Sequence, residues 1–206
     1  RPRLDPSAVA WLAVIVTLCV PLWWGIHPQF SWDVDNTAPG SVLKGIAHRF
    51  GPGWYSSYGP VPYYMIAAVY APALLLARLV GELGAPSSIY PWGFAHPDLA
   101  MAGLVILARA VALGLALTIV GLAMKQASAR GARPWIACAL LAGAPAFVFY
   151  ARTSNVDMYY LFWLWVAMAL LAGRRALPHL MGAGAASALA VCCKEQAAPF
   201  SAIAAL

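Results

Sequence analysis

Apolar residues in this chain form long uninterrupted runs, whereas a half-buried strand or a surface helix would alternate them with polar residues. The first run, residues 8–26, is uncharged. As an α-helix it would be about 28 Å long, close to the roughly 30 Å thickness of a bilayer's hydrocarbon layer. We therefore predict that residues 8–26 cross a membrane.

The same criterion predicts further spans at residues 99–124, 134–150, 158–173 and 177–193. The apolar stretch Val61–Leu79 is ambiguous because it contains Pro62, Pro72 and Arg78. These residues favour a helix that lies in the outer interface, or that enters the membrane and returns, with a true crossing as the alternative. We expect one all-α module over residues 1–206, a polytopic transmembrane helix bundle with interfacial helices in a long first loop.

Composition supports a membrane protein, since 63% of the residues are hydrophobic and only 10% are charged. The net charge of +6 does not indicate nucleic acid, because basic residues collect in the cytoplasmic loops of membrane proteins. We place three basic clusters in the cytoplasm: Arg1 and Arg3; Lys125, Arg130 and Arg133; Arg174 and Arg175. Residues 27–98 then form the first extracytoplasmic loop of a multi-pass protein, which we assign to a bacterial inner membrane with its active face outside.

Two carboxylates, Asp33 and Asp35, follow the first apolar run in "FSWDVDNTAPG". Residues 38–50 then have the pattern of a short amphipathic helix, and we expect its apolar face to lie toward the membrane. On one interpretation the carboxylates are solvated, with Asp35 or Thr37 capping this helix. On the other, they act as a general base or as metal ligands. A divalent metal is compatible with the sequence but is not required by it.

Other charged residues fall on the same predicted side. Arg152 and Asp157 lie in "YARTSNVDMYY", either as an interfacial anchor or as a phosphate-binding arginine with an orienting aspartate. Lys194 either forms an ion pair with Glu195 or binds a phosphate group. Arg109 either reaches lipid headgroups or lines the same pocket. The outer face also collects His48, Arg49 and Tyr58.

The remaining patterns add exclusions. The four cysteines, Cys19, Cys138, Cys192 and Cys193, lie in apolar runs, and we interpret them as packing residues. The sequence has no Walker loop, dinucleotide fingerprint, zinc-ligand spacing or Ser-His-Asp signature. Because it ends at "SAIAAL" within an apolar run, we expect it to be part of a longer chain.

The order of these features resembles the amino-terminal half of GT-C membrane glycosyltransferases, which include protein O-mannosyltransferases and lipid A aminoarabinose transferases. The features are "W-x-x-D" in the first outer loop, "YGPVPYY", "P-x-x-x-x-Y-A-R-x-x-x-x-D" and a lysine that ends a later span. Asn36 stands where the group has a glutamate, and Gly59 where it has a proline.

The resemblance implies an inverting transfer of sugar from a polyprenyl-phosphate donor to a hydroxyl of an acceptor protein, lipid or glycan. Asp35 resembles the catalytic aspartate, and Asp33 could supply the second carboxylate. Arg152, Lys194 and Arg109 are candidates for the donor phosphate, while Asp157 and Tyr58 would orient the site. The alternative function is a non-catalytic membrane subunit, or a transporter segment, that binds lipid or a partner protein. We expect activity to require residues downstream of position 206.

Overall fold

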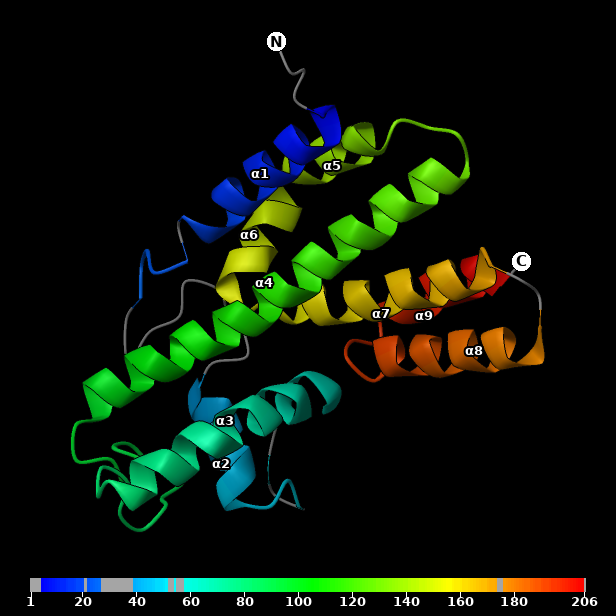
Figure 1. Cartoon of the computed structure of the whole chain (residues 1–206). Helices are drawn as coiled ribbons and strands as arrows, with labels where there is room; N and C mark the ends of the chain where they lie inside the picture. The colour runs from blue at the N-terminus through cyan, green and yellow to red at the C-terminus, as the bar shows by residue number, and fades with distance from the viewer. Residues whose placement is uncertain are drawn as a thin grey trace.

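The computed structural model of the protein describes residues 5–20, 22–26, 39–51, 54, 58–173 and 176–205. Within these residues the regular structure is helical, apart from an isolated bridge between Leu83 and Phe94 (Figure 1). The helices are α1 Pro6–Cys19, α2 Pro39–Ala47, α3 Val61–Leu79, α4 Pro97–Ala129, α5 Pro134–Ala142, α6 Pro145–Thr153, α7 Val156–Leu171, α8 Leu177–Val191 and α9 Ala197–Ala205. The predicted all-α class is confirmed for the described residues.

Helix α4 is the axis of the fold. Its 33 residues correspond to about 50 Å at helical rise. It runs through the centre of the molecule in Figure 1 and packs against α1, α2, α3, α5, α6 and α7. Its buried residues recur every three or four positions, as one face of a helix requires: Leu104, Ala108, Ala112, Ala116 and Ile119. The alanines let neighbouring helices approach closely.

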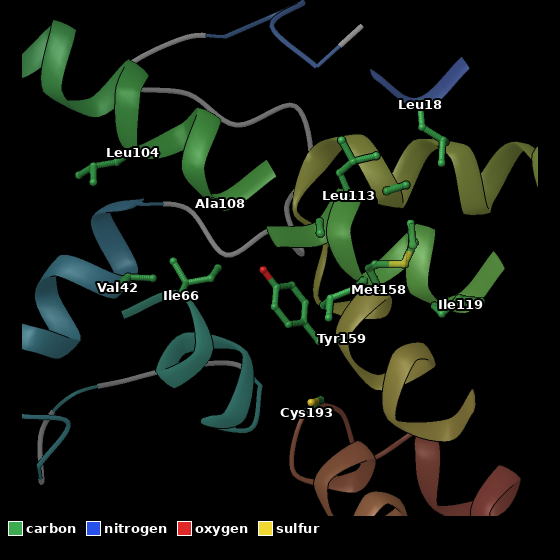
Figure 2. Packing of buried hydrophobic residues seen from close by; sticks show 14 of the residues in the cluster. Leu18, Val42, Ile66, Leu104, Ala108, Leu113, Ile119, Met158, Tyr159 and Cys193 are labelled. Atoms are coloured by element: carbon green, nitrogen blue, oxygen red, sulfur yellow. The ribbon is translucent and has the colours of Figure 1, made fainter. Parts of the chain in front are cut away.

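The core joins this face of α4 to residues from the other helices. Figure 2 shows Leu18 of α1, Ile66 of α3 and Met158 of α7 around α4, with the Tyr159 ring lying between Ile66 and Cys193. The Tyr70 hydroxyl donates a 2.8 Å hydrogen bond to the carbonyl of Leu104, so the polar end of this buried ring is satisfied.

Two helices, α3 and α4, are long and apolar enough to cross a membrane, and the bent pair α5 and α6 adds a third if it counts as one span. Helices α1, α7 and α8 are apolar but shorter, with 14, 16 and 15 residues. The predicted apolar segments 158–173 and 177–193 are therefore helical to within two residues of their expected ends.

The helix expected over residues 8–26 ends early, at Cys19, and residues 22–25 form turns. The carbonyls of these turns accept hydrogen bonds from the guanidinium of Arg109 in α4. A continued helix would use most of those carbonyls internally, and the buried arginine would lack acceptors. The prediction of one unbroken first helix was therefore wrong.

The expected span at residues 134–150 is also interrupted. Helices α5 and α6 meet at an angle of 72° across Gly143 and Ala144. Pro145 begins α6, and Ala144 before it is extended, with φ −85° and ψ 108°. Proline has no N–H to continue the helix and disfavours helical backbone in the residue before it. The prolyl residue is thus the start of a second helix.

Two expectations for the first loop also change. Helix α3 is continuous over Val61–Leu79 with Pro72 inside it, so this segment does not enter and return. Helix α2 confirms the predicted amphipathic helix, but Val42 and Leu43 are buried and α2 packs on α3 and α4. Its apolar face therefore packs in the protein core. We had expected this face to lie against lipid.

Candidate functional site

The turn between α6 and α7 positions the first acidic residue of the candidate site. Ser154 ends α6 in the left-handed region, with φ 58°, a common helix-ending conformation. Asn155 then caps α7, because its side-chain oxygen accepts a 2.7 Å hydrogen bond from the backbone N–H of Asp157. Asp157 therefore lies in the first turn of α7, where the helix dipole favours a carboxylate.

Lys194 reaches this carboxylate from the turn between α8 and α9. Its ammonium nitrogen lies 2.6 Å from Oδ1 of Asp157. The two side chains are only 6% and 12% exposed, so the bond is a buried ion pair. Glu195 is exposed, and the proposed pairing of Lys194 with Glu195 was wrong. The turn directs consecutive side chains to opposite sides, and only Lys194 faces the start of α7.

Tyr58 contributes a third segment to the same cluster. The Lys194 ammonium lies 5.1 Å from the centre of the Tyr58 ring, within the range of a cation–π contact. The following residue, Gly59, is in direct contact with the turn that carries Lys194. A Cβ atom at this position would lie 1.8 Å from the carbonyl oxygen of Cys192, closer than any side chain permits. Glycine is thus needed where the GT-C pattern has proline.

Tyr58, Asp157 and Lys194 form what we call the ion-pair cluster. Buried hydroxyl groups lie nearby at the end of α6 and in α7, where the oxygens of Ser154 and Tyr159 are 3.5 Å apart. Sequence reasoning missed Ser154, Asn155, Tyr159 and Gly59. The Asn155 cap could have been found, since asparagine before an apolar run is a common helix start. The role of Gly59 depends on its contact with the distant Cys192.

Arg109 binds the segment that follows α1. Its guanidinium donates hydrogen bonds to the carbonyls of Leu22 and Trp24, both at 2.8 Å, and of Gly25 at 3.4 Å. The side chain is buried, so the expectation that it reaches lipid headgroups was wrong. It fixes the segment after α1 against α4, and its described contacts are with that segment.

The remaining predicted residues have separate surroundings. Arg152 is half-buried in the last turn of α6, and its Nε donates to the carbonyl of Val148 at 3.1 Å. His48 and Arg49 are exposed in the turn after α2. Asp33 and Asp35, the predicted catalytic carboxylates, lie outside the described residues.

The cysteines only partly follow the expected packing role. All four are free thiols, and Cys138 and Cys193 are buried. Cys192 is exposed, because it lies in the turn after α8 with its backbone, and not its side chain, against Gly59.

The chemistry open to the ion-pair cluster follows from its charge balance. Burial of a lone ammonium or carboxylate is strongly unfavourable, and each group here offsets the charge of the other. The ion pair can therefore join two segments, and the contact of Lys194 with the Tyr58 ring adds a third. Within the described residues, no group of three or more His, Cys, Asp or Glu side chains is placed to hold a metal ion.

Comparisons of the chain with known protein families, curated proteins and solved structures find no match.

Proposed function

We propose that the protein transfers a sugar from a polyprenyl-phosphate donor to an acceptor hydroxyl at the extracytoplasmic face of a membrane, as GT-C enzymes do. The observation that supports this function is the ion-pair cluster. Tyr58, Asp157 and Lys194 come from three of the four motifs on which the resemblance depends, and they meet in the fold although Asp157 and Lys194 are 37 positions apart. The surrounding bundle would be polytopic, in a bacterial inner membrane.

In the proposed reaction Asp35 accepts the proton of the acceptor hydroxyl as its oxygen attacks the anomeric carbon. The bond from that carbon to the phosphate oxygen breaks, with inversion, and the polyprenyl phosphate leaves with increased negative charge. Arg152 is the better candidate for stabilising this charge, because its planar guanidinium suits phosphate oxygens.

Within this proposal we assign roles to the other residues from their contacts. Lys194 becomes a positioning residue, since Asp157 already compensates its charge. Arg109 anchors residues 22–25, which precede Asp33 by eight positions, and so fixes where the loop bearing Asp33 and Asp35 begins. Asp33 is the second carboxylate in place of the missing glutamate.

The compensated charge of Lys194 also favours the alternative function, a non-catalytic membrane subunit. In such a protein the ion-pair cluster would serve only to join α3, α7 and the turn after α8. The two functions differ in whether a carboxylate at position 35 is needed for turnover.

The test uses the full-length protein with polyprenyl-phosphate mannose and polyprenyl-phosphate aminoarabinose as donors. Release of free polyprenyl phosphate is measured by mass spectrometry, because that product does not depend on the identity of the acceptor. We expect Asp35→Asn to lower the rate by roughly 10²–10⁴-fold, the usual contribution of a general base. Asp98→Asn, which removes an exposed carboxylate at the start of α4, should leave the rate unchanged.

Two results would contradict the proposal. One is equal release by Asp35→Asn and the unaltered protein. The other is no release from either donor by a protein whose helical content is intact, which would favour the subunit.

A further inference from the structure

A cavity of about 560 Å³ lies between the C-terminal ends of α4 and α7 and the first turns of α8. In Figure 1 these three helix ends are on the side of the molecule away from α2 and α3. One part of the cavity wall is apolar, with Leu122, Val166 and Leu170. The other part is polar and basic and consists of Lys125, Gln126, Arg130 and His179.

Two nitrogen atoms of this polar wall have no partner. Nε2 of Gln126 and Nδ1 of His179 are shielded from solvent and make no hydrogen bond with any described residue. Buried polar atoms are nearly always paired, so each such exception calls for an explanation. Nε2 of an amide is a donor, and Nδ1 of imidazole is a donor when it carries the ring proton. With the ring proton on Nδ1, an acceptor would satisfy both atoms.

The charge of the wall specifies the kind of acceptor. Lys125 and Arg130 line the cavity, and none of its described lining residues is acidic. Ammonium and guanidinium groups beside two neutral donors form a suitable setting for phosphate oxygens. A phosphate group in the cavity would give Gln126 and His179 the acceptor they lack once their side chains turn toward it.

The apolar part of the cavity wall favours a lipid over a free phosphate ion as the ligand. Leu122, Val166 and Leu170 would be left against water by an inorganic ion, whereas acyl carbon would cover them. Helix α8 also carries exposed apolar residues, with Leu177, Leu180 and Met181 69%, 46% and 67% exposed.

The geometry points to a binding site for an anionic phospholipid, with its phosphate on Lys125, Gln126, Arg130 and His179 and its acyl chains along Leu122, Val166 and Leu170. This site is distinct from the ion-pair cluster. Asp157 lies in the first turn of α7, whereas the cavity is lined by Val166 and Leu170, about 14 and 20 Å further along the helix at helical rise. The inference therefore does not depend on the proposed glycosyl transfer.

The test measures the unfolding temperature of the full chain in neutral detergent as phosphatidylglycerol is titrated in, with phosphatidylcholine as the reference lipid. Arg130→Gln and Arg133→Gln make the same chemical change three positions apart in one loop, but only Arg130 lines the cavity. We expect Arg130→Gln to weaken the apparent affinity for phosphatidylglycerol at least fivefold. The control Arg133→Gln should change it less than twofold.

His179→Leu gives a second measurement that does not depend on surface charge. This variant removes an unpaired buried nitrogen, so it should be at least as stable as the unaltered protein in phosphatidylcholine alone. It should nevertheless lose at least half of the stabilisation by phosphatidylglycerol. Retention of the full stabilisation would overturn the site.

Two further results would also overturn it. The first is an equal loss of affinity in Arg130→Gln and Arg133→Gln, which would indicate general attraction to an anionic surface. The second is an equal stabilisation by inorganic phosphate at the same phosphate concentration, which would indicate an ion site without a lipid. If Arg130→Gln does not fold, Lys125→Gln replaces it in the same comparison.

Discussion

At the scale of single residues, buried charged side chains in this protein bind polar groups that are far away in the sequence. Lys194 binds Asp157, and Arg109 binds carbonyls of a segment that precedes it by more than 80 residues. Each polar group would be unfavourable in the core if its partner were missing. The arrangement therefore makes specific helix contacts obligatory, where apolar packing alone would tolerate alternatives.

The ion-pair cluster gives the first prediction. Asp157→Asn takes the carboxylate from the buried Lys194 ammonium, and Lys194→Met takes the ammonium from the buried Asp157 carboxylate, so each should lower the free energy of unfolding by about 3–5 kcal/mol. The double variant Asp157→Leu/Lys194→Met removes both charges and should recover most of that loss. Glu195→Gln, at an exposed neighbouring carboxylate, should stay within about 0.5 kcal/mol. Unfolding in sodium dodecyl sulfate, followed by circular dichroism, measures all four. Additive losses in the double variant would contradict the pairing.

The close contact of Gly59 with Cys192 gives the second prediction. A Cβ at position 59 meets the Cys192 carbonyl at 1.8 Å, so the backbone must move apart. Gly59→Ala should cost on the order of 1–3 kcal/mol, as overpacking does in other cores. Gly114→Ala is the matched control, because nothing lies within 4 Å of its Cβ position in α4. This control should be neutral, or stabilising by up to about 1 kcal/mol. Equal stability of the two variants in the same assay would show that Gly59 is not confined.

At the scale of elements, the connection between α3 and α4 is held by Glu82 and His96. One carboxylate oxygen of Glu82 accepts from the backbone N–H of His96 at 2.6 Å, and the other lies 2.9 Å from the ring Nδ1. The hydrogen bonds with His96 lower the pKa of Glu82 below 4.5, and the bond with Glu82 raises the pKa of His96 above 6.5. Both effects stabilise the charged pair.

The third prediction concerns the pH range of this contact. The contribution of His96 is complete below pH 6.5 and is lost as the pH rises through its raised pKa. The contribution of Glu82 is complete above pH 4.5 and is lost as the pH falls through its lowered pKa. Hydrogen exchange of the His96 amide, corrected for its intrinsic rate, should therefore be slowest between pH 4.5 and 6.5. Glu82→Gln should flatten the profile, and a flat profile in the unaltered protein would refute the contact.

The elements also show what the sequence could predict. Hydrophobic runs located the helices, because a run of this kind has to be removed from water wherever it lies. They could not locate the end of α1 at Cys19, since that end depends on Arg109, 87 positions from Leu22. The bend before α6 was accessible in principle from Pro145, but proline also occurs within α3. A proline therefore marks a possible break, and packing decides whether it occurs.

For the candidate site, the residue types were predictable and their partners were not. A lysine at the end of an apolar run needs an anion, and the sequence alone does not show whether that anion is Asp157 or Glu195. The choice of Asp157 follows from the packing of α7 on α8, which brings the turn after α8 to the capped start of α7. No local pattern contains that information.

At the scale of the whole molecule, α3 and α4 are both long enough to cross a membrane, and the location of the loops depends on whether α3 does so. Lys125 in the last turns of α4, with Arg130 and Arg133 after it, favours a cytoplasmic location for that end of the helix. If α4 crosses and α3 does not, the turns before and after α3 are both outside. If α3 also crosses, those turns are in opposite compartments. Exposed leucines on α3, among them Leu75, Leu76 and Leu79, show that its outer surface suits lipid.

The last prediction tests this arrangement with single cysteines at exposed positions in a background where Cys19 and Cys192 are serine. Lys44→Cys lies on α2, Ala85→Cys between α3 and α4, and Ser128→Cys at the end of α4. The proposed function requires the first loop to be extracytoplasmic. In intact cells a membrane-impermeant maleimide should therefore label positions 44 and 85, and should label position 128 only after the membrane is opened. Labelling of 44 and 85 from opposite sides would make α3 a crossing helix. Helix α4 would then cross back, and Lys125 would lie in the same compartment as position 44, which contradicts the tendency of basic residues to stay in the cytoplasm.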